Sequence, residues 1–560
     1  MYLSEGKLDS VLKLLKEPRL HLFVHRKLNL SNPRGNTKIA FKISLPLAKH
    51  IKNSDILINV HANITHAALD NVVAGRGITN GHFILDADTS KLSLSGQGMI
   101  GNIPSRIFYS ANLHHAGPQE ILEQAHVTSC LTPALLAAAG YHTDNYFYGS
   151  TNLTVQYRQM GNHTSTIQVG LDLTPALIKT PLWRKKIGQP AEASASIELT
   201  HGHITTIQHI TALGQGLSLL GNATIYPDKS FDLFFSSFQI ANSVGQAQFV
   251  FPTFASDKAK FLQKQKRIVY ANIQASRLDL SSLISHRLSD QKIKKEVQHT
   301  SDLHKTQTMK SLTWIVNVAA QNLWYSKNKP PISGVTASFE ESKNHLEKLN
   351  FSMRDPTPVQ ISLTPVKQQR VVTARIEDVG HLLAAFNILP DVQGGNAILK
   401  GSFNDTEPSD PFSGKITVSP FVLNKAPTTL RIMRDVSLPS WITAQNSSNL
   451  KITHLTIPLT FENGTIKINN ARTGNMALGA TIKGIINIAQ NNIHLRGTVA
   501  PLFAINRLPG KIPGLGWIFS PERGSGILAF TFDVTGKLKK PTLHINPFSI
   551  LLPGALRHIL

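Results

Sequence analysis

Apolar and polar residues alternate along most of this chain, and clusters of turn-forming residues interrupt the alternation at short intervals. Near the C-terminus, Asn463-Gly464 separates two such runs. This dipeptide is a strong hairpin signal, because a type I′ turn needs positive φ at both central positions. Period-two alternation predicts antiparallel strands with one apolar and one polar face. The apolar positions around this turn are Leu455, Ile457, Leu459, Phe461, Ile466 and Ile468.

The same pattern recurs in both halves of the chain, without the crossover segments of about a dozen residues that parallel strands require. We therefore predict a mainly β protein, built as an elongated, twisted antiparallel sheet with a few short helices. The alternation selects further apolar-face positions, namely Ile56, Ile58, Val60, Ile482, Ile486, Ile488, Ile493, Leu495, Leu528, Phe530, Phe532 and Val534.

A sheet with one apolar face must bury that face against another layer or enclose something apolar. A closed β-sandwich does this with protein. A curled sheet does it with lipid, whose acyl chains gain about 0.8 kcal/mol for each buried CH₂ group. The periodicity of the sequence fits both solutions equally.

Helices are predicted to be few and short. Helical spacing of apolar residues occurs over 7–16, 379–389 and 427–436, and Thr132, Pro133 and Gly140 fall at the N-cap, N1 and C′ positions of another helix. Residues 257–310 are strand-poor beyond Leu280 and rich in Lys and Arg. We expect four regions: an N-terminal helix and lead-in (1–34), a first β section (35–256), a basic, partly helical connecting segment (257–310) and a second β section (311–560).

Composition narrows the possible partners. Lys and Arg number 57 against 34 Asp and Glu, a net charge of +23, yet charged residues make up only 16% of the chain. The positive excess favours an anionic partner, or else a solvated basic surface. Aromatic residues are only 7% and no nucleic-acid-binding motif occurs, so anionic membrane surfaces are favoured over nucleic acid. The single cysteine, Cys130, excludes an intrachain disulfide and a cysteine-rich zinc site.

Catalytic motifs are missing from the sequence. It contains no HExxH, Walker A, GxSxG or helix-opening GxGxxG pattern. Histidine and aspartate pairs that could bind a metal lack further ligands nearby and are interpreted as polar-face strand residues; they are His114 with His115, His201 with His203, and Asp86 with Asp88. We predict a protein that is not an enzyme and has no metal or other cofactor.

Several short stretches carry a resemblance to a known family. They begin at Asp378-Val-Gly-His-Leu-Leu and Gly394-Gly395, and continue with 478–487 around Gly484, 495–501 around Gly497 and ending at Pro501, Asn506, 512–516 around Pro513, and 534–547 with Gly536, Pro541, Asn546 and Pro547. A second group starts at Asp172-Leu173 and runs through Trp183 to Gly188. In order and spacing these stretches resemble the YhdP-type branch of the AsmA-like superfamily, over most of 35–560.

The resemblance implies a sheet curled into a taco-like apolar groove. It implies a bridge-like carrier that conducts phospholipids between the inner and outer membranes of diderm bacteria, with the apolar positions above lining the groove. The glycines at 484, 497 and 536 would let the sheet bend, and the prolines at 501, 513 and 541 would end strands. The alternative is a structural or assembly factor of the outer membrane, with a closed sandwich or solenoid core and no lipid conduit.

The resemblance also implies a place in the cell envelope, periplasmic and associated with the inner membrane. Family members typically begin with a membrane-spanning helix, whereas this sequence has no apolar stretch of about 20 residues and no signal-peptide pattern at its start. We therefore expect a truncated chain, a wrongly assigned start, or an inner-membrane anchor or partner protein that supplies the missing segment, with phospholipids as the cargo.

Overall fold

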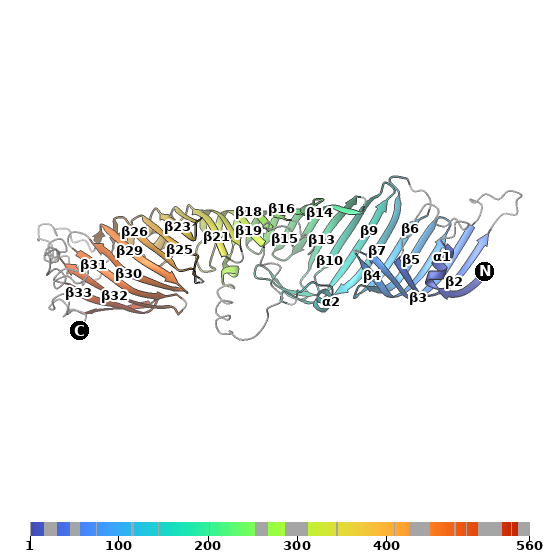
Figure 1. Ribbon diagram of the computed structural model, residues 1–560, viewed down its shortest axis with the longest axis horizontal. Helices are drawn as coiled ribbons and strands as arrows, with labels where there is room; N and C mark the ends of the chain where they lie inside the picture. Colours follow the sequence, from blue (N-terminus) through green and yellow to red (C-terminus); the bar gives the residue numbers. More distant parts are fainter. Residues whose placement is uncertain are drawn as a thin grey trace. The chain divides into compact units, whose positions relative to one another are not determined.

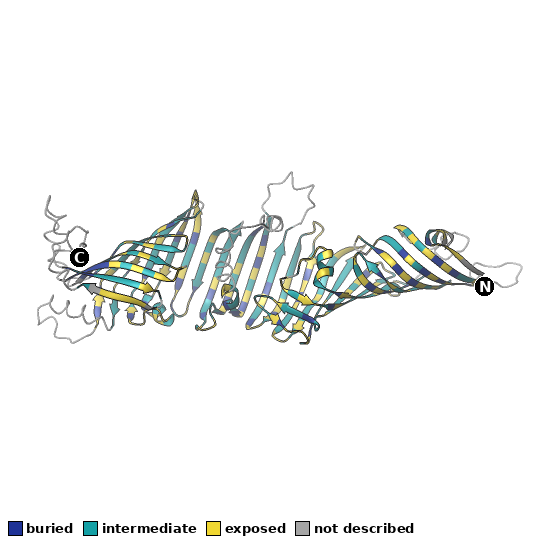
Figure 2. Ribbon diagram, turned by 90° about the horizontal axis from the view of Figure 1, so that it is seen from below, coloured by how far each residue is buried: buried dark blue, intermediate teal, exposed yellow. Residues whose placement is uncertain are grey.

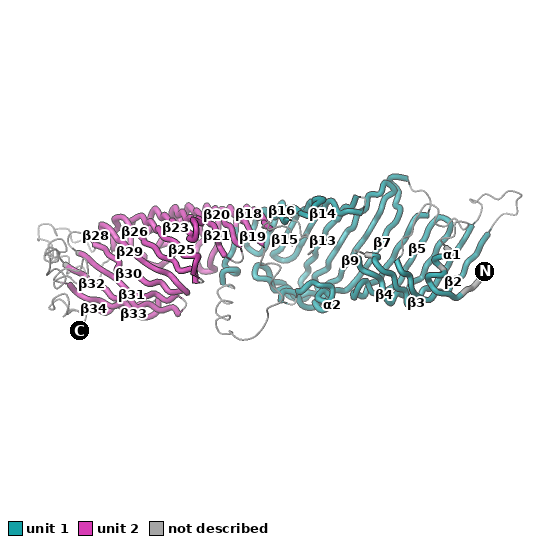
Figure 3. The backbone as a smooth tube through the Cα atoms, viewed as in Figure 1, with its two compact units in different colours: residues 1–265, 278–298 teal, residues 266–277, 299–560 magenta. Residues whose placement is uncertain are grey.

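The computed structural model describes most of the chain. The described residues are 2–15, 31–44, 57–73, 75–113, 117–143, 145–200, 202–252, 267–285, 312–342, 345–407, 409–424, 449–474, 478–488, 490–501, 529–538 and 540–546. The protein is mainly β, with a long, twisted antiparallel sheet that is left open (Figure 1). This confirms the predicted fold class. The chain divides into two compact units, unit 1 (1–265 and 278–298) and unit 2 (266–277 and 299–560) (Figure 3).

Unit 1 carries a meander of strands in which each strand pairs antiparallel with the next one in the sheet. The strands are β1 (Tyr2–Lys7), β2 (Ser31–Ser44), β3 (Leu57–Val73), β4 (Arg76–Asp88), β5 (Lys91–Ile100), β6 (Ile103–Asn112), β7 (Ile121–Leu131), β9 (Thr151–Met160), β10 (Thr164–Asp172), β13 (Ala191–Thr200), β14 (His203–Gly214), β15 (Leu217–Ile225), β16 (Phe231–Ile240) and β17 (Ser243–Phe251). A small sheet joins β8 (Phe147–Gly149), β11 (Ala176–Lys179) and β12 (Arg184–Lys185).

Unit 2 repeats this architecture with its own meander. The strands are β19 (Leu312–Trp324), β20 (Ile332–Ser342), β21 (His345–Met353), β22 (Val359–Val366), β23 (Gln369–Ile376), β25 (Ala397–Asn404), β26 (Phe412–Val418), β29 (His454–Glu462), β30 (Thr465–Gly474), β31 (Leu478–Asn487), β32 (Asn492–Pro501), β33 (Phe530–Lys537) and β34 (Lys540–Asn546). A small sheet joins β24 (Val392–Gly394), β27 (Phe421–Leu423) and β28 (Leu450–Ile452).

The predicted hairpin between two of these strands is confirmed. Strands β29 and β30 flank Asn463 and Gly464, whose φ angles are 47° and 77°. Both central residues are therefore left-handed, as a type I′ turn requires. The turn fixes the register that places Phe461 directly opposite Ile466.

The short helices follow their capping signals. The predicted N-terminal helix is α1 (Leu8–Leu15), and α2 (Pro133–Ala138) is capped by the Thr132 hydroxyl, which accepts a hydrogen bond from the Leu135 amide. Helix α4 (Val379–Ala385) ends earlier than the predicted 379–389, and 427–436 lies outside the described residues. Among the helices in the described ranges, none combines the length and hydropathy that a bilayer-spanning helix requires.

The connecting segment predicted at 257–310 contains a strand that the sequence interpretation did not assign. This strand, β18 (Arg267–Asp279), belongs to the same long sheet. Its alternate positions Val269, Ala271 and Ala275 are buried. The Lys- and Arg-rich composition of the segment as a whole concealed this short period-two pattern.

Candidate functional site

Most of the predicted apolar positions near the C-terminus fall in continuous rows across unit 2. Residues directly opposite each other in an antiparallel pair point to the same face. In one row Phe461 is opposite Ile466, Ile466 is opposite Ile486, and Ile486 is opposite Ile493. The period-two pattern therefore brought residues from four strands onto one surface, which we call the apolar face.

Two further rows run parallel to the first. The second contains Leu459, Ile468, Leu495 and Val534, with Gly484 between Ile468 and Leu495. The third joins Ile482, Gly497 and Phe532. Along β29, Leu455 and Ile457 point the same way, opposite Val418 and Ile416.

The apolar face continues through the earlier strands of unit 2. Val316 is opposite Phe339, which is opposite Leu349, and the row continues through Leu363 to Val372. The polar side chains of these strands point to the other surface, which we call the polar face. Figure 2 shows buried and exposed positions alternating along the strands.

Unit 1 has an apolar face of its own. Ile64, Phe83, Gly96, Ile107 and Val127 lie opposite one another on five successive strands. The predicted lining residues Ile58 and Val60 lie on this face and are 7% and 5% exposed, whereas Asn59 and His61 beside them are exposed.

A few predicted positions fall elsewhere. Ile488 was expected to continue the alternation of β31, but it follows the end of that strand and is 54% exposed. Its amide donates a hydrogen bond across to the Gly464 carbonyl, and its own carbonyl accepts one from the Asn491 amide, so Ile488 begins the turn that follows β31. Ile56, Leu528, Pro513 and Pro547 lie outside the described residues.

Burial within unit 2 indicates which way the sheet curls. Leu363 and Phe412 on the apolar face are 4% and 6% exposed, while Lys400 and Lys415 on the polar face are exposed. In a sheet, side chains crowd one another on the concave side and spread apart on the convex side. Around β22–β26 the apolar face is the more crowded one, as the concave side of a curled sheet would be; at the β31–β33 end, Thr481 and Thr498 of the polar face are buried as well. Most side chains of the apolar face in β29–β32 are only half-buried, Phe461, Ile466, Ile486 and Ile493 among them.

Two elements cover part of the apolar faces. In unit 1, Leu8 of α1 is 5% exposed and packs in one cluster with Ile64 and Phe83, with Leu12 against it. In unit 2, Leu450 and Ile452 of β28 pack in a cluster with Val499, Phe530 and Phe532. The predicted lining residues Phe530 and Phe532 therefore have protein partners, whereas Ile486 lies in the less covered part of the face.

Aromatic rings lie across glycines on the apolar face. Phe532 is directly opposite Gly497, and a Cβ atom at 497 would lie 2.3 Å from the Phe532 Cζ atom. The Phe412 ring covers Gly401 and Gly414 in the same way, with Cζ 2.5 Å and 2.7 Å from their notional Cβ positions. This arrangement lets strands bend while the ring restores the lost apolar surface. Sequence reasoning missed the pairing, because it depends on strand register.

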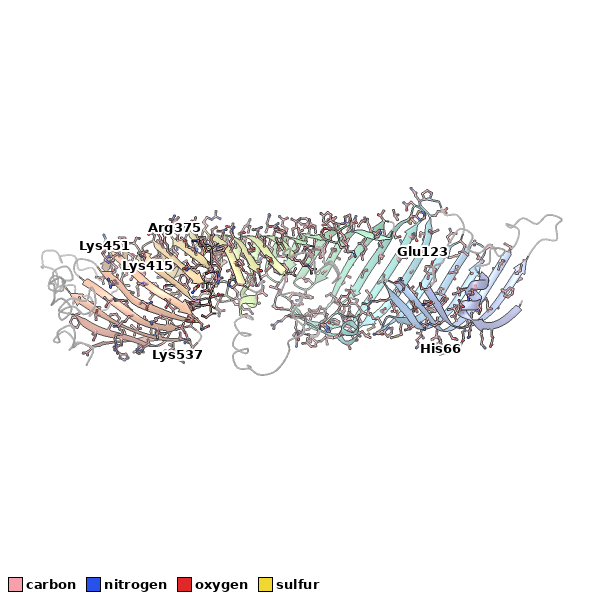
Figure 4. The ribbon with its side chains drawn as sticks, in the orientation of Figure 1. His66, Glu123, Arg375, Lys415, Lys451 and Lys537 are labelled. Carbon is pink, nitrogen blue, oxygen red and sulfur yellow. The ribbon has the colours of Figure 1, made fainter. Side chains whose placement is uncertain are left out.

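Polar groups interrupt the apolar face of unit 1 near the strand ends. The Tyr109 and Tyr157 hydroxyls donate hydrogen bonds of 2.5 Å and 3.1 Å to the two carboxylate oxygens of Glu123, which is labelled in Figure 4. Glu123 is opposite Gln159 on β9. The hydrogen bonds offset the desolvation of a carboxylate placed beside apolar neighbours.

An ion-pair cluster lies at one end of the apolar face in unit 2. The Arg370 side chain is 6% exposed, and its Nε atom lies 2.8 Å from Asp405 Oδ1. Its Nη2 atom lies 3.3 Å from Asp410, and its guanidinium carbon lies 4.9 Å from the centre of the Phe403 ring. His345, Asp405 and Asp410 have ligand atoms close enough for a metal ion, but the Arg370 guanidinium already supplies positive charge there. The cluster is a structural ion-pair network.

The stretch from Asp172 to Gly188 forms a compact corner in unit 1. The amides of Leu173 and Gly188 donate to the carbonyls of Ala191 and Thr174, and the Trp183 indole donates to the Gln215 carbonyl. Hydrogen bonds from the Thr174 hydroxyl and amide lower the pKa of Asp172.

Lys185, 3% exposed, stabilises the same corner. Its ammonium group donates to the carbonyls of Thr174, Ala176 and Lys186 at 3.1, 2.8 and 3.0 Å. Burial lowers the Lys185 pKa. The motif residues around it are therefore structural.

The C-terminal motif residues are structural as well. Asp378 caps α4 by accepting a hydrogen bond from the His381 amide, and the Gly395 carbonyl accepts from the Val379 amide; Gly394 and Gly395 have positive φ. Gly484 also has positive φ, and a Cβ there would lie 2.2 Å from the His494 carbonyl oxygen.

The expectation that prolines end strands is correct for one of the two in the described ranges. Pro501 is the last residue of β32. Pro541 is the second residue of β34, opposite Gly536, so it stands near a strand start, where the missing N–H of proline costs little. Asn546 is the last residue of β34.

Of the histidine and aspartate pairs noted in the sequence, the described residues include Asp86, Asp88 and His203. Asp86 lies 2.6 Å from the His61 ring, and Asp88 accepts hydrogen bonds from Ser90 and Lys91 in the turn after β4. His203 begins β14, while His114, His115 and His201 lie outside the described residues.

Comparison with protein-family models, with curated proteins and with solved structures finds no match to this chain. The resemblance to the AsmA-like superfamily therefore stays a prediction.

Proposed function

We propose that the apolar faces of the sheet form a groove for phospholipid acyl chains. The protein would then be a non-enzymatic, bridge-like lipid carrier of the cell envelope, as the resemblance to AsmA-like proteins implies. The observation that supports this function best is the set of apolar rows in unit 2, which run from β19 to β34 and stay half-exposed between β29 and β32. An apolar face that the protein covers only in part needs an apolar occupant.

The dimensions of the unit 2 sheet suit that occupant. Its meander has thirteen strands, the sixteen from β19 to β34 less β24, β27 and β28. At about 4.8 Å between neighbours, twelve gaps span roughly 58 Å along the curved sheet. That is about twice the ~30 Å hydrocarbon core of a bilayer. Several acyl chains would fit one after another along the groove, as a conduit requires.

The energetics favour acyl chains over water in this groove. Each buried CH₂ contributes about 0.8 kcal/mol, so about a dozen methylenes on the apolar face would contribute about 10 kcal/mol before ordering costs. The headgroup can stay in water, because the sheet is open and leaves the mouth of the groove uncovered. Because the row from Phe461 through Ile466 and Ile486 to Ile493 contains no polar side chain, a lipid can slide along this row from strand to strand.

Neighbouring isoleucines on β31 provide a matched test. Ile486 is half-buried on the apolar face, and Ile485 is 47% exposed on the polar face. We expect the full chain and Ile485→Arg to co-purify with phospholipid, detected by native mass spectrometry, and Ile486→Arg to lose most of it. The same variants are compared for transfer of labelled phospholipid between vesicles.

Two results would overturn the proposal. Unmodified protein without phospholipid would favour a structural role in the envelope, which is the alternative function. Equal lipid loss in both arginine variants would show that the effect is not specific to the apolar face. Phe530 is a poorer site for this test, because it packs against Leu450 and Ile452 and its replacement disturbs the core.

A further inference from the structure

Positively charged side chains are spread over several neighbouring strands on the polar face of unit 2, and we call this set of side chains the field. Exposed cations on the polar face between β23 and β31 are Arg375, Lys400, Lys415, Lys467, Arg472 and Lys483. Arg375 and Lys415 are labelled in Figure 4. Within the ranges of strands β23 to β32 of the long sheet, the one acidic residue on this face is Glu462, at the end of β29.

Some of these cations lie directly opposite one another on neighbouring strands, which lowers the stability of the sheet. Lys400 lies directly opposite Lys415, and Lys483 lies directly opposite Arg496. Like charges in directly opposite positions of an antiparallel pair destabilise the sheet. Arg496 is partly compensated, because its Nε atom donates a 2.8 Å hydrogen bond to Asp533 on β33. The Lys400–Lys415 pair is suited to an anionic partner, which removes the repulsion when it binds.

The field is a local feature and does not simply reflect the net charge of the chain. On the polar face of unit 1, between β7 and β17, the described strands carry one arginine, Arg158. The acids on that face are Asp172, Glu192, Glu198 and Asp232. Serine, threonine and glutamine fill most of the other positions. Strands β2 and β6 of unit 1 do carry exposed polar-face cations, Lys38, Lys42 and Arg106, so the contrast holds between β23–β32 of unit 2 and β7–β17 of unit 1.

The form of the field fits a lipid surface better than a nucleic acid. The strands from β23 to β32 in the meander are seven, so six gaps of about 4.8 Å spread the charge over roughly 29 Å. Val371 and Ile485, 37% and 47% exposed, lie among the cations and can enter the headgroup region. The phenylalanines of these strands point to the apolar face, so this side offers bases no stacking platform.

We infer that the polar face of β23–β32 docks unit 2 onto an anionic phospholipid surface. Each lysine or arginine near such a surface contributes about 1 kcal/mol. The docking face is the opposite side of the sheet from the proposed groove, and it would act whether or not the groove holds lipid. In a lipid carrier it would hold the conduit beside the leaflet that supplies or receives the cargo.

The test measures vesicle binding of the full chain by co-sedimentation. Vesicles contain either phosphatidylcholine alone or phosphatidylcholine with phosphatidylglycerol, at low and at moderate salt. The variant Lys400→Gln/Lys415→Gln is compared with Arg106→Gln/Arg158→Gln, which removes the same charge from exposed polar-face positions of unit 1.

We expect binding to the anionic vesicles only, weakened by salt, and weakened about 25-fold by the two lysine substitutions at about 1 kcal/mol each. The arginine variant should bind within about twofold of the unmodified chain. Equal loss in both variants would overturn the assignment to this face. Failure to bind anionic vesicles, or tighter binding to a DNA duplex than to vesicles, would contradict the proposal that the partner is an anionic phospholipid surface. Lipid content of the purified chain, unchanged in both variants, separates this outcome from a failure of the groove.

Discussion

The ring of Phe532 lies across Gly497 on the neighbouring strand, and a Cβ atom at 497 would also meet the Thr481 carbonyl oxygen at 2.3 Å. The ring can rotate away, but the carbonyl belongs to a sheet backbone that has little freedom to move. We therefore expect Gly497→Ala to destabilise unit 2 by about 1–3 kcal/mol, measured by urea unfolding.

Gly170 on β10 is the control for that substitution, because nothing lies within 4 Å of its notional Cβ position. Gly170→Ala should leave stability unchanged or raise it by about 0.5–1 kcal/mol, since alanine has less conformational freedom to lose on folding. Equal effects of the two substitutions would show that the close approach at 497 plays no part.

Arg370 should be among the least replaceable residues of unit 2. Its guanidinium donates to Asp405 and, at 2.7 Å, to the Leu346 carbonyl, in a buried position. Removing one partner of a buried ion pair leaves the other charge uncompensated, at a cost of about 3–5 kcal/mol. We expect that loss for Arg370→Met in thermal or urea unfolding. Arg370→Met/Asp405→Asn should recover part of it, and no recovery would mean that the loss comes from packing alone.

The faces of the strands could be predicted from the sequence because their period is two and the Asn463-Gly464 turn fixes one register. Phe461, Ile466 and Ile486 were therefore placed correctly on one surface. The period fails where the strand is irregular. In β30 the register shifts between Ile468 and Ala471, with Asn470 at φ 57°, and local alternation does not reveal such a bulge.

Long-range features could not be predicted from alternation alone. The Phe532–Gly497 contact and the Lys400–Lys415 pair depend on which strands are neighbours and in which register. Arg370 stands next to Val371 and Val372, so its place on the apolar face became clear only from its position opposite Phe403. Leu450 covers part of the apolar face of unit 2, and this contact could not be predicted because it depends on tertiary packing.

Lys185 gives a pH-dependent prediction. Burial lowers its pKa in the folded state below the ordinary 10.5, so between the two values the unfolded chain binds more protons than the folded chain. The contribution of this lysine to stability therefore rises as the pH increases through the lowered pKa toward 10.5. Unfolding free energies between pH 8 and pH 11, compared between the unmodified chain and Lys185→Met, isolate the effect.

At neutral pH, Lys185→Met should destabilise the corner by about 1–3 kcal/mol, because three buried carbonyls lose a donor. The difference between the two proteins should widen with pH in the stated window. A constant difference would contradict the lowered pKa.

Helix α1 should act as a cover for the apolar face of unit 1, because Leu8 packs with Ile64 and Phe83. Truncating Leu8 removes a buried side chain, and Leu8→Ala should weaken the helix–sheet contact by about 2–5 kcal/mol. The exposed apolar face should then bind more of a hydrophobic dye, and the N-terminal residues should be cleaved faster by protease.

Asp9, which pairs with Lys13 at 2.8 Å on the exposed side, provides the control. Asp9→Ala should change stability by about 0.3–0.5 kcal/mol and leave dye binding unchanged. Equal dye binding by the two variants would show that the helix does not shield this face.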